Sequence, residues 1–354
     1  MNPFYALGVY LWETCYRIGV FPIRKLAIPV ISVGNITAGG SGKTPMVLRI
    51  AQFALDRGKC PGILSRGYGG TKSRSSAPFV FRGKDLPRAE EVGDEPAMMA
   101  GKLPDGLFGI CPDRLQGGLA LQNAGADLII LDDGFQSLEL FQDLNIVFVP
   151  DAMAGGCSRS LLHWLPAGDL RDFPSRLSRA DILSFIDKGT EGGSPDFLKQ
   201  KIEDCLEAMG ISQAGQVVLG ARLTFSGIVG TDFKPKETLE DLRGKNSVVV
   251  SGIARPERFE RFLRTLGIEP VAHLMLKDHV PYSAKRIQEI GEWIASIEKK
   301  HQVDRILTTE KDLVKWACSP DPDKRLRGIS VQMEWLDPEG WMRKIDRVLG
   351  QTPR

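Results

Sequence analysis

The residues best suited to chemistry form a short loop near the N-terminus. Three glycines stand just ahead of a Lys-Thr pair, namely Gly39, Gly40, Gly42, Lys43 and Thr44. Glycine lets a backbone curl so that successive N–H groups point at phosphate oxygens next to a helix N-terminus. The lysine adds a point charge for terminal phosphates, and the threonine hydroxyl stands where Mg²⁺ binds in such loops. We therefore predict a nucleotide site made by Thr37, Ala38, Gly39, Gly40, Ser41, Gly42, Lys43 and Thr44.

The loop departs from the G-x-x-x-x-G-K-[ST] pattern at one position, because Thr37 stands where the first glycine is expected. Its flanks still favour a P-loop over a structural turn. A β-rich run ends just before the loop, and an apolar helix is predicted to follow over residues 46–51. Pro45 falls in the first helical turn, where its missing N–H costs little. Strand, glycine loop and helix in this order predict nucleotide binding.

Two carboxylates, Asp132 and Asp133, follow an apolar strand predicted over residues 127–131. A carboxylate at the end of a buried parallel strand beside a P-loop is where the Mg²⁺ of a bound nucleotide needs an oxygen ligand. We predict Asp132 as this ligand together with Thr44, and Asp133 as a further candidate. Two acids in a turn also occur without function, so the metal prediction depends on the P-loop.

Polar residues beside glycine or proline mark three further segments. Arg66 lies in a glycine-rich loop after a short strand, where it could meet phosphate or belong to a solvated turn. Asp94 and Glu95 precede a helix with an early proline, and alone they would indicate a helix cap. His279 lies between a strand-like run and a helix over residues 284–300, although a single histidine is more often structural than catalytic.

Repeated strand and helix units predict an α/β fold, a P-loop NTPase-type doubly wound parallel sheet with a second, smaller α/β domain. The chain has 354 residues, 42% hydrophobic and 25% charged, which is enough for a large core in about two domains. We place the P-loop core with its N-terminal helix at residues 1–215 and the smaller domain at 216–330. A C-terminal segment, 331–354, would pack back on the core. Two short paired strands, 217–220 and 223–225, would join the domains.

Basic charge gathers in the N-terminal quarter of the chain. The whole chain has a net charge of +2, but residues 1–89 contain 13 Lys and Arg against 3 Asp and Glu. This part should therefore meet an anion, which could be nucleotide phosphates, a phosphorylated substrate or a membrane surface. Nucleic acid is not expected, because there is no dense basic run interleaved with aromatics. Six scattered cysteines without metal-ligand spacing indicate reduced thiols in a cytosolic compartment.

An apolar and aromatic run over residues 4–12 opens the chain, and Arg17, Arg24 and Lys25 follow it. The run is far shorter than the ~20 residues that span a bilayer, and it lacks the basic start and the cleavage site of a signal peptide. Two interpretations stay open. One is a helix that lies in a membrane surface, and the other is a first helix packed on the core.

Together these motifs resemble one known family, the tetraacyldisaccharide 4'-kinases (LpxK) of lipid A biosynthesis. The resemblance runs from about residue 3 to the C-terminus, and a threonine in place of the first P-loop glycine is the family's own form. Two places depart from the family pattern. Asp172 stands where the family often has glutamate, and altered spacing after His279 leaves the role of Tyr282 open. The segments that carry the resemblance are residues 34–37 leading into 39–45, 65–69, 93–96, 131–136, 179–181, 252–254, 278–279 and 309–312.

The resemblance implies a kinase that uses ATP and Mg²⁺ to phosphorylate the 4'-hydroxyl of a tetraacylated glucosamine disaccharide 1-phosphate, giving lipid IVA. Asp94 would activate this hydroxyl, His279 on the second domain would pair with Asp94 on domain closure, and Lys43 would stabilise charge on the transferring phosphates. The acceptor is an amphiphile, so we expect a peripheral enzyme on the cytoplasmic face of the bacterial inner membrane, with no protein partner implied. Candidate substrate-binding residues are Asn35, Arg66, Tyr68, Glu95 and Arg171.

A P-loop GTPase or ATPase that acts as a switch or an insertion chaperone is the alternative, because its fold would look much the same. A GTPase should carry an Asn/Thr-Lys-x-Asp motif to bind guanine. The nearest stretch, residues 309–312, has the wrong spacing. The sequence therefore favours the kinase over a protein that transfers phosphate only to water.

Overall fold

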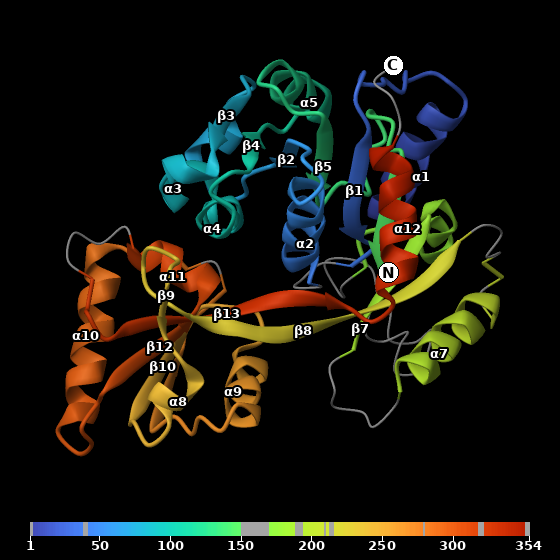
Figure 1. The fold of residues 1–354 in the computed structure, drawn as a ribbon. Coiled ribbons are helices and arrows are strands. Elements are labelled where there is room, and N and C mark those ends of the chain that lie inside the picture. Colours follow the sequence, from blue (N-terminus) through green and yellow to red (C-terminus); the bar gives the residue numbers. More distant parts are fainter. Residues whose placement is uncertain are drawn as a thin grey trace.

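The computed structural model describes residues 3–37, 42–149, 170–187, 194–208, 210–211, 216–278, 280–317 and 322–350. Within these ranges, one curled and mostly parallel sheet of 13 strands runs through the molecule (Figure 1). The strands are β1 Val30–Asn35, β2 Pro61–Ser65, β3 Phe79–Arg82, β4 Leu107–Ile110, β5 Leu128–Asp132, β6 Leu144–Phe148, β7 Ile182–Asp187, β8 Val217–Val229, β9 Pro235–Glu237, β10 Ser247–Ser251, β11 Ala272–Met275, β12 Arg305–Thr309 and β13 Leu326–Trp335. Their order is β11-β10-β12-β13-β8-β7-β6-β1-β5-β2-β4-β3, and β9 pairs with β8.

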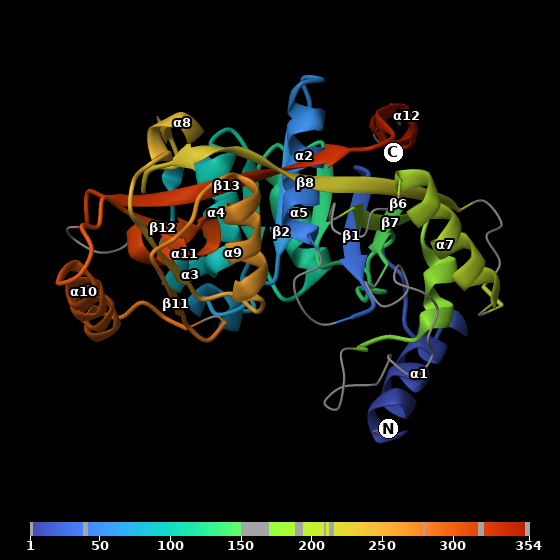
Figure 2. The same ribbon diagram turned by 90° about the horizontal axis from the view of Figure 1, so that it is seen from below.

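Helices alternate with these strands along the chain, as the sequence predicts for an α/β fold. The described α-helices are α1 Pro3–Arg17, α2 Lys43–Leu55, α3 Ala89–Val92, α4 Asp94–Lys102, α5 Arg114–Asn123, α7 Pro195–Ala208, α8 Leu239–Leu242, α9 Pro256–Thr265, α10 Ala284–Glu298, α11 Glu310–Ala317 and α12 Pro338–Leu349. Short 3₁₀ segments lie at Thr71–Arg74, Gly83–Asp85 and Pro174–Arg179. Figure 2 shows α10 near one end of the sheet and α7 near the other, with α1 extending from the body of the molecule.

The central strands are buried on both faces. β1 pairs in parallel with β5 and β6, and all six of its residues are buried. Along β5, Leu128 and Ile130 pack into the hydrophobic cluster that contains residues of α2, whereas Ile129 and Leu131 pack into a separate cluster. Apolar runs of this kind suit a parallel sheet covered on both sides. The predicted doubly wound sheet is therefore confirmed.

One long strand joins the two halves of the sheet. β8 runs without a break over Val217–Val229, so the prediction of two short paired strands at 217–220 and 223–225 is wrong. The reason is a change of partners. β8 pairs in parallel with β7 up to Arg222, and from Ala221 onward it pairs antiparallel with β13, with one irregularity opposite Ser330 and Val331, so β8 has a partner strand along its whole length.

Beyond β13, the sheet continues in parallel through β12, β10 and β11. A hydrophobic cluster joins β10 and β12 to α10 and α11, which gives this half a core of its own. The sheet nevertheless passes without interruption from one half to the other. The boundaries at residues 215 and 330 stay a prediction.

The C-terminal helix returns to the P-loop half. Trp341 of α12 is fully buried, stacks on Trp335 with 5.5 Å between ring centroids, and donates a hydrogen bond to the Gly220 carbonyl over 3.1 Å. Trp335 in turn meets Phe53 of α2 edge to face at 5.3 Å. The end of the chain is thus packed against the helix that begins at Lys43.

The cysteines differ in part from the sequence prediction. Cys15, Cys60 and Cys111 are free thiols. Cys205 on the buried face of α7 is disulfide-bonded, so the prediction of six reduced thiols is wrong at this position. Sequence spacing does not show which thiols meet in space. Cys157 and Cys318 lie outside the described residues.

We expect Trp341→Ala to lower the free energy of unfolding by ~3–5 kcal/mol, because it leaves a large cavity in the core and removes the hydrogen bond from the indole to the Gly220 carbonyl. Trp341→Phe should cost less. Urea unfolding of the purified protein measures both changes, and Phe197→Ala on the exposed side of α7 is the control. A loss below ~1 kcal/mol for Trp341→Ala would show that α12 contributes little to the core.

Candidate active site

The P-loop joins the end of β1 to the start of α2. Gly42 caps the helix with a φ of 78°, a left-handed conformation that residues with a side chain rarely adopt and that favours glycine. Thr37 pairs with Leu170 through an isolated bridge, and Thr44 is the second residue of α2. The predicted nucleotide-binding residues Ala38, Gly39, Gly40 and Ser41 lie outside the described residues.

Lys43 is held at the edge of the sheet by two oxygens. Its Nζ lies 3.1 Å from Asn35 Oδ1 and 3.3 Å from Asp133 Oδ1. Arg171 also donates hydrogen bonds to Asn35 and to both carboxylate oxygens of Asp133. The sequence analysis named all four residues, and the structure brings them together. The ammonium of Lys43 is therefore fixed in place by its neighbours.

Asp133 is a stable carboxylate in this cluster. It has a φ of 56°, a left-handed conformation that is uncommon for a residue with a side chain. Burial alone would raise the pKa of Asp133, but the hydrogen bond from Arg171 and the charge of Lys43 hold this pKa far below its usual range. The carboxylate thus already has two cationic partners.

Asp132 differs from Asp133 in its hydrogen bonds and in the direction of its pKa shift. It is almost completely buried, and only Oδ2 has a hydrogen bond, from the Ser65 hydroxyl at 3.1 Å. Oδ1 is buried without a partner. Burial first, and then the charges of Glu95 and Asp133, raise the pKa of Asp132 to about 7. A buried carboxylate oxygen without a hydrogen bond is costly, and a divalent cation would relieve this cost.

The residues around Asp132 therefore fit a divalent cation. Among the described residues, no group of three or more His, Cys, Asp or Glu side chains forms a metal cage. A P-loop magnesium site needs no such cage, because phosphates, waters and the P-loop hydroxyl supply the other ligands. The donors that this chain offers are the carboxylate of Asp132 and the hydroxyl of Thr44.

Arg114 is a functional candidate that the sequence analysis missed. It is completely buried and donates hydrogen bonds to the backbone carbonyls of Asp132, at 2.8 Å, and Leu64, at 3.2 Å. It thereby fixes the ends of β5 and β2 relative to each other. The only sequence signal was its place at the start of a helix after Asp113, which caps that helix.

The predicted base lies at the contact between the two halves of the sheet. Asp94 is the first residue of α4, and its Oδ2 lies 3.3 Å from Nζ of Lys315 in α11. Glu95 pairs with Lys311 at 3.6 Å, and Lys311 also lies 3.5 Å from Asp278. The negative charge of Glu95 is one of the causes that raise the pKa of Asp132. His279 lies outside the described residues.

Arg66 and Tyr68 lie on the loop that packs against the start of α4. A side chain at Gly93 would meet the Tyr68 carbonyl at 2.5 Å, so the two loops are in close contact. The Arg66 guanidinium lies 3.4 Å from the Tyr68 hydroxyl, and the Tyr68 side chain is 66% exposed. The two side chains are thus available at the rim of the site.

Asp172 and Tyr282 mark the two departures from the family pattern, and both side chains are buried. Asp172 is fully buried, accepts hydrogen bonds from Arg176 and Gln136, and so keeps contacts despite its shorter side chain. Tyr282 is buried, and its ring meets Trp316 edge to face at 5.5 Å. Burial, followed by the charge of Asp312, raises the pKa of Tyr282, which therefore stays a neutral packing residue.

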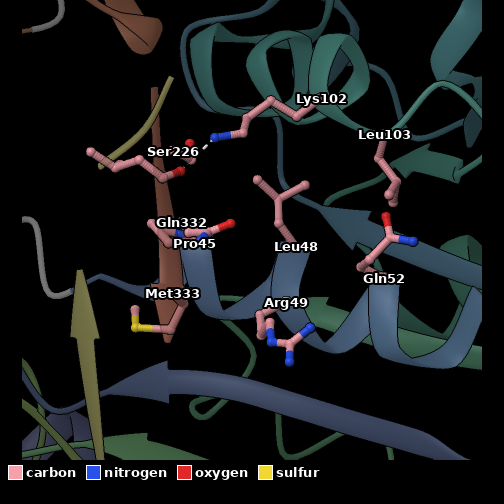
Figure 3. Close-up of a pocket in the computed structure, with 10 residues that line it drawn as sticks. Pro45, Leu48, Arg49, Gln52, Lys102, Leu103, Ser226, Gln332 and Met333 are labelled. Atoms are coloured by element: carbon pink, nitrogen blue, oxygen red, sulfur yellow. Dashed lines mark hydrogen bonds between the residues drawn. The ribbon is translucent and has the colours of Figure 1, made fainter. Parts of the chain in front are cut away.

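A separate pocket of about 190 Å³ lies behind the P-loop helix (Figure 3). In the close-up, Leu48 of α2 points toward Lys102 at the end of α4, and Gln52 of α2 points toward Leu103. Of the predicted site residues that the structure describes, none lines this pocket. We therefore place the candidate active site at the ends of β1 and β5, where the charged groups meet.

Comparisons with known proteins agree with this geometry. The family model described as "LpxK: Tetraacyldisaccharide-1-P 4'-kinase" matches residues 1–350. The tetraacyldisaccharide 4'-kinase of Geobacter metallireducens is 33% identical over 348 residues, covering 98% of this chain and 95% of the relative. That of Syntrophus aciditrophicus is 36% identical over 323 residues, covering 89% and 82%.

A solved structure supports the same conclusion. LpxK from Aquifex aeolicus in complex with ATP is 28% identical, with a TM-score of 0.76, and the match covers 98% of this chain and 96% of that one. The match of the family model over almost the whole chain, together with relatives of this identity and coverage, shows the family. The chain belongs to the LpxK family of tetraacyldisaccharide-1-P 4'-kinases.

Proposed function

We propose that this chain transfers the γ-phosphate of ATP to the 4'-hydroxyl of a tetraacylated glucosamine disaccharide 1-phosphate, which forms lipid IVA. The observation that carries the proposal is the edge of the sheet where Lys43 contacts Asn35 at the end of β1, and where the buried Asp132 oxygen lies at the end of the adjacent strand β5. The names of the relatives support the same acceptor. Both of these relatives are named as kinases, so the alternative of a P-loop switch or chaperone is not favoured.

In this proposal the P-loop holds the phosphates of ATP. Residues Gly39 to Thr44 would offer backbone N–H groups, and Lys43 would stabilise charge that moves onto the β- and γ-phosphates. Asn35 and Asp133 already hold Lys43 at the strand edge. Because the ammonium is in place beforehand, little reorganisation is needed during the reaction.

The metal ion would bind between the P-loop and β5. The Thr44 hydroxyl and Oδ1 of Asp132 would hold Mg²⁺, and its charge would neutralise the phosphate oxygens as the bond to phosphorus breaks. Both oxygens of Asp133 are engaged with Arg171. We therefore propose that Asp133 holds Lys43 and Arg171 in place. Its role as a Mg²⁺ ligand stays a prediction.

Asp94 would take the proton of the acceptor hydroxyl. A sugar hydroxyl is a poor nucleophile at neutral pH, so a kinase places a carboxylate beside it. Asp94 lies at the start of α4, next to Glu95, whose charge acts on Asp132. His279 would pair with Asp94. Asn35, Arg66, Tyr68, Glu95 and Arg171 stay the candidates for contacts with the disaccharide.

The lipid tails imply that the enzyme works at a membrane surface, and α1 is the element suited to it. Apolar side chains of α1 and the segment after it are 36% to 65% exposed: Leu7, Tyr10, Leu11, Trp12, Ile18, Val20, Phe21 and Ile23. A patch of this kind on a soluble surface marks an interaction site. Of the helices described, none has both the length and the apolar character to cross a bilayer.

Ion pairs tie α1 to the core. Glu13 pairs with the buried Arg176, and also with Arg179 at 3.4 Å. Arg176 in turn pairs with the buried Asp172. We infer that α1 lies in the surface of the cytoplasmic leaflet of the inner membrane, with its apolar side chains in the lipid and Glu13 anchored to the enzyme.

We expect Lys43→Ala to lose ~10²-fold or more of the rate while the protein stays folded, because it removes a positioned charge from the transferring phosphates. The assay uses purified protein, γ-labelled ATP, Mg²⁺ and the disaccharide acceptor in detergent, and it measures labelled lipid. Absence of labelled lipid with the parent protein would contradict the proposed function. Near-parental turnover of Lys43→Ala would contradict the P-loop assignment alone.

Thr44→Ala and Asp132→Ala should act through the metal ion. Their rates should rise more steeply with Mg²⁺ concentration than that of the parent, because each removes one ligand. Rates measured over a Mg²⁺ series at saturating ATP test this expectation. Ser137→Ala, a buried hydroxyl after the same strand, is the control. The same Mg²⁺ dependence in parent and variants would exclude both residues as ligands.

The double variant Leu7→Glu/Leu11→Glu should release the protein from anionic vesicles and leave ATP binding intact, because it places charge on the apolar face of α1. Co-sedimentation with vesicles measures binding, which should also weaken with salt. Leu119→Glu/Phe197→Glu adds the same charge at exposed apolar sites elsewhere. Unchanged co-sedimentation of the α1 variant, or its unfolding, would instead support a core helix.

A further inference from the structure

Helices α4 and α11 pair through complementary charges. The acidic first turn of α4 faces lysines of α11, and the lysine that ends α4 faces the glutamate that begins α11. The pairs are Asp94–Lys315 at 3.3 Å, Glu95–Lys311 at 3.6 Å and Lys102–Glu310 at 2.8 Å. The two helices therefore run antiparallel, and each ion pair joins the P-loop half of the sheet to the other half (Figure 1).

Lys315 is the most deeply buried lysine of the three. Only 4% of its side chain is exposed, compared with 18% for Lys311 and 19% for Lys102. A buried ammonium is tolerated only where acceptors surround it. Nζ of Lys315 lies 3.3 Å from Asp94 Oδ2 and 3.2 Å from Asp312 Oδ1, so it connects two carboxylates.

Asp312 holds Lys315 in a fixed position. Its side chain is fully buried, and Oδ2 accepts hydrogen bonds from the Gly252 N–H at 2.9 Å and the Thr309 hydroxyl at 2.8 Å. Gly252 directly follows β10, and Thr309 is the last residue of β12. The Tyr282 ring lies 5.4 Å from the ammonium and covers it from another side. Lys315 is thus fixed by the far half of the sheet.

We propose that Lys315 is a positioning residue for phosphoryl transfer, which holds the Asp94 carboxylate in the orientation that takes the proton of the acceptor hydroxyl. The inference rests on the proposed role of Asp94 as the base. A base must point a lone pair at the proton that it removes, and a misplacement of about 1 Å can lower a rate ~10²-fold. Asp312, which is bonded to residues at β10 and β12, holds Lys315. Lys315 therefore fixes Asp94, the first residue of α4 in the P-loop half, relative to these two strands.

A purely structural role for Lys315 makes a different prediction, and the chain offers a matched control. Lys102 also joins α4 to α11, and its Nζ lies 3.2 Å from the Ser330 hydroxyl and 2.6 Å from the Val331 carbonyl. It lies at the opposite end of α4 from Asp94. Loss of Lys102 should therefore weaken the same helix contact without touching the base.

The test compares Lys315→Met, Lys315→Arg, Lys102→Met and Asp94→Asn in the labelled-lipid assay, with melting temperature measured for each variant. We expect Lys315→Met to lower kcat ~10²-fold with the KM for ATP within about twofold. Lys315→Arg should recover at least about tenfold of that loss, because it restores the charge. Lys102→Met should lower the melting temperature as much as Lys315→Met does, yet keep kcat within about threefold of the parent.

The double variant Asp94→Asn/Lys315→Met shows whether Lys315 acts through Asp94. The kcat of the double variant should be no lower than that of Asp94→Asn. Once the Asp94 carboxylate is removed, the loss of the residue that positions it has no further effect. Multiplied losses, a parental kcat in Lys315→Met, or failure of both Lys315 variants to fold would overturn the proposal. Full activity of Asp94→Asn would overturn the base assignment itself, and with it this inference.

Discussion

Burial at the end of β5 places two adjacent carboxylates in opposite electrostatic states. Asp133 turns into a left-handed conformation, meets Arg171 and Lys43, and stays ionised. Asp132 stays in the strand, loses its hydration, and keeps one oxygen without a hydrogen bond. One carboxylate thereby fixes the P-loop lysine, and under the proposed function the other would hold the cation. The negative charge of Asp133 is also one of the causes that raise the pKa of Asp132, after burial and the charge of Glu95.

The continuous sheet makes the position of this edge depend on the whole molecule. β8 carries hydrogen bonds from β7 to β13, and the tryptophans of β13 and α12 bring the chain back onto α2. A change in the twist of either half of the sheet would therefore shift the start of the P-loop helix α2. The ion pairs between α4 and α11 link the halves a second time, at the side where the acceptor is expected.

Polar contacts also connect the exposed first helix to the P-loop. Glu13 contacts Arg176, Arg176 contacts Asp172, and Asp172 accepts a hydrogen bond from Gln136, which donates to the Asn35 carbonyl. Asn35 contacts Lys43. Short buried chains of this kind hold their members in one arrangement, because every unpaired group in them is costly. A membrane-bound α1 would thus hold the enzyme with the P-loop edge in a defined orientation to the lipid surface.

The sequence by itself determined the parts that follow from local pattern. A β-rich run, glycines and Gly-Lys-Thr predicted the P-loop, and an apolar strand before two acids predicted where Asp132 would lie. These predictions need only the period of a strand and the place of a loop at its end. The family resemblance was confirmed for the same reason, since its motifs are contiguous in the chain.

The tertiary structure alone decided which aspartate is paired, that β8 is one strand, that Cys205 is bonded, and that Lys315 and Arg114 are buried beside the site. Each of these depends on burial and on contacts between residues far apart in the chain, and charge and burial at such contacts are set by packing rather than by neighbours in sequence.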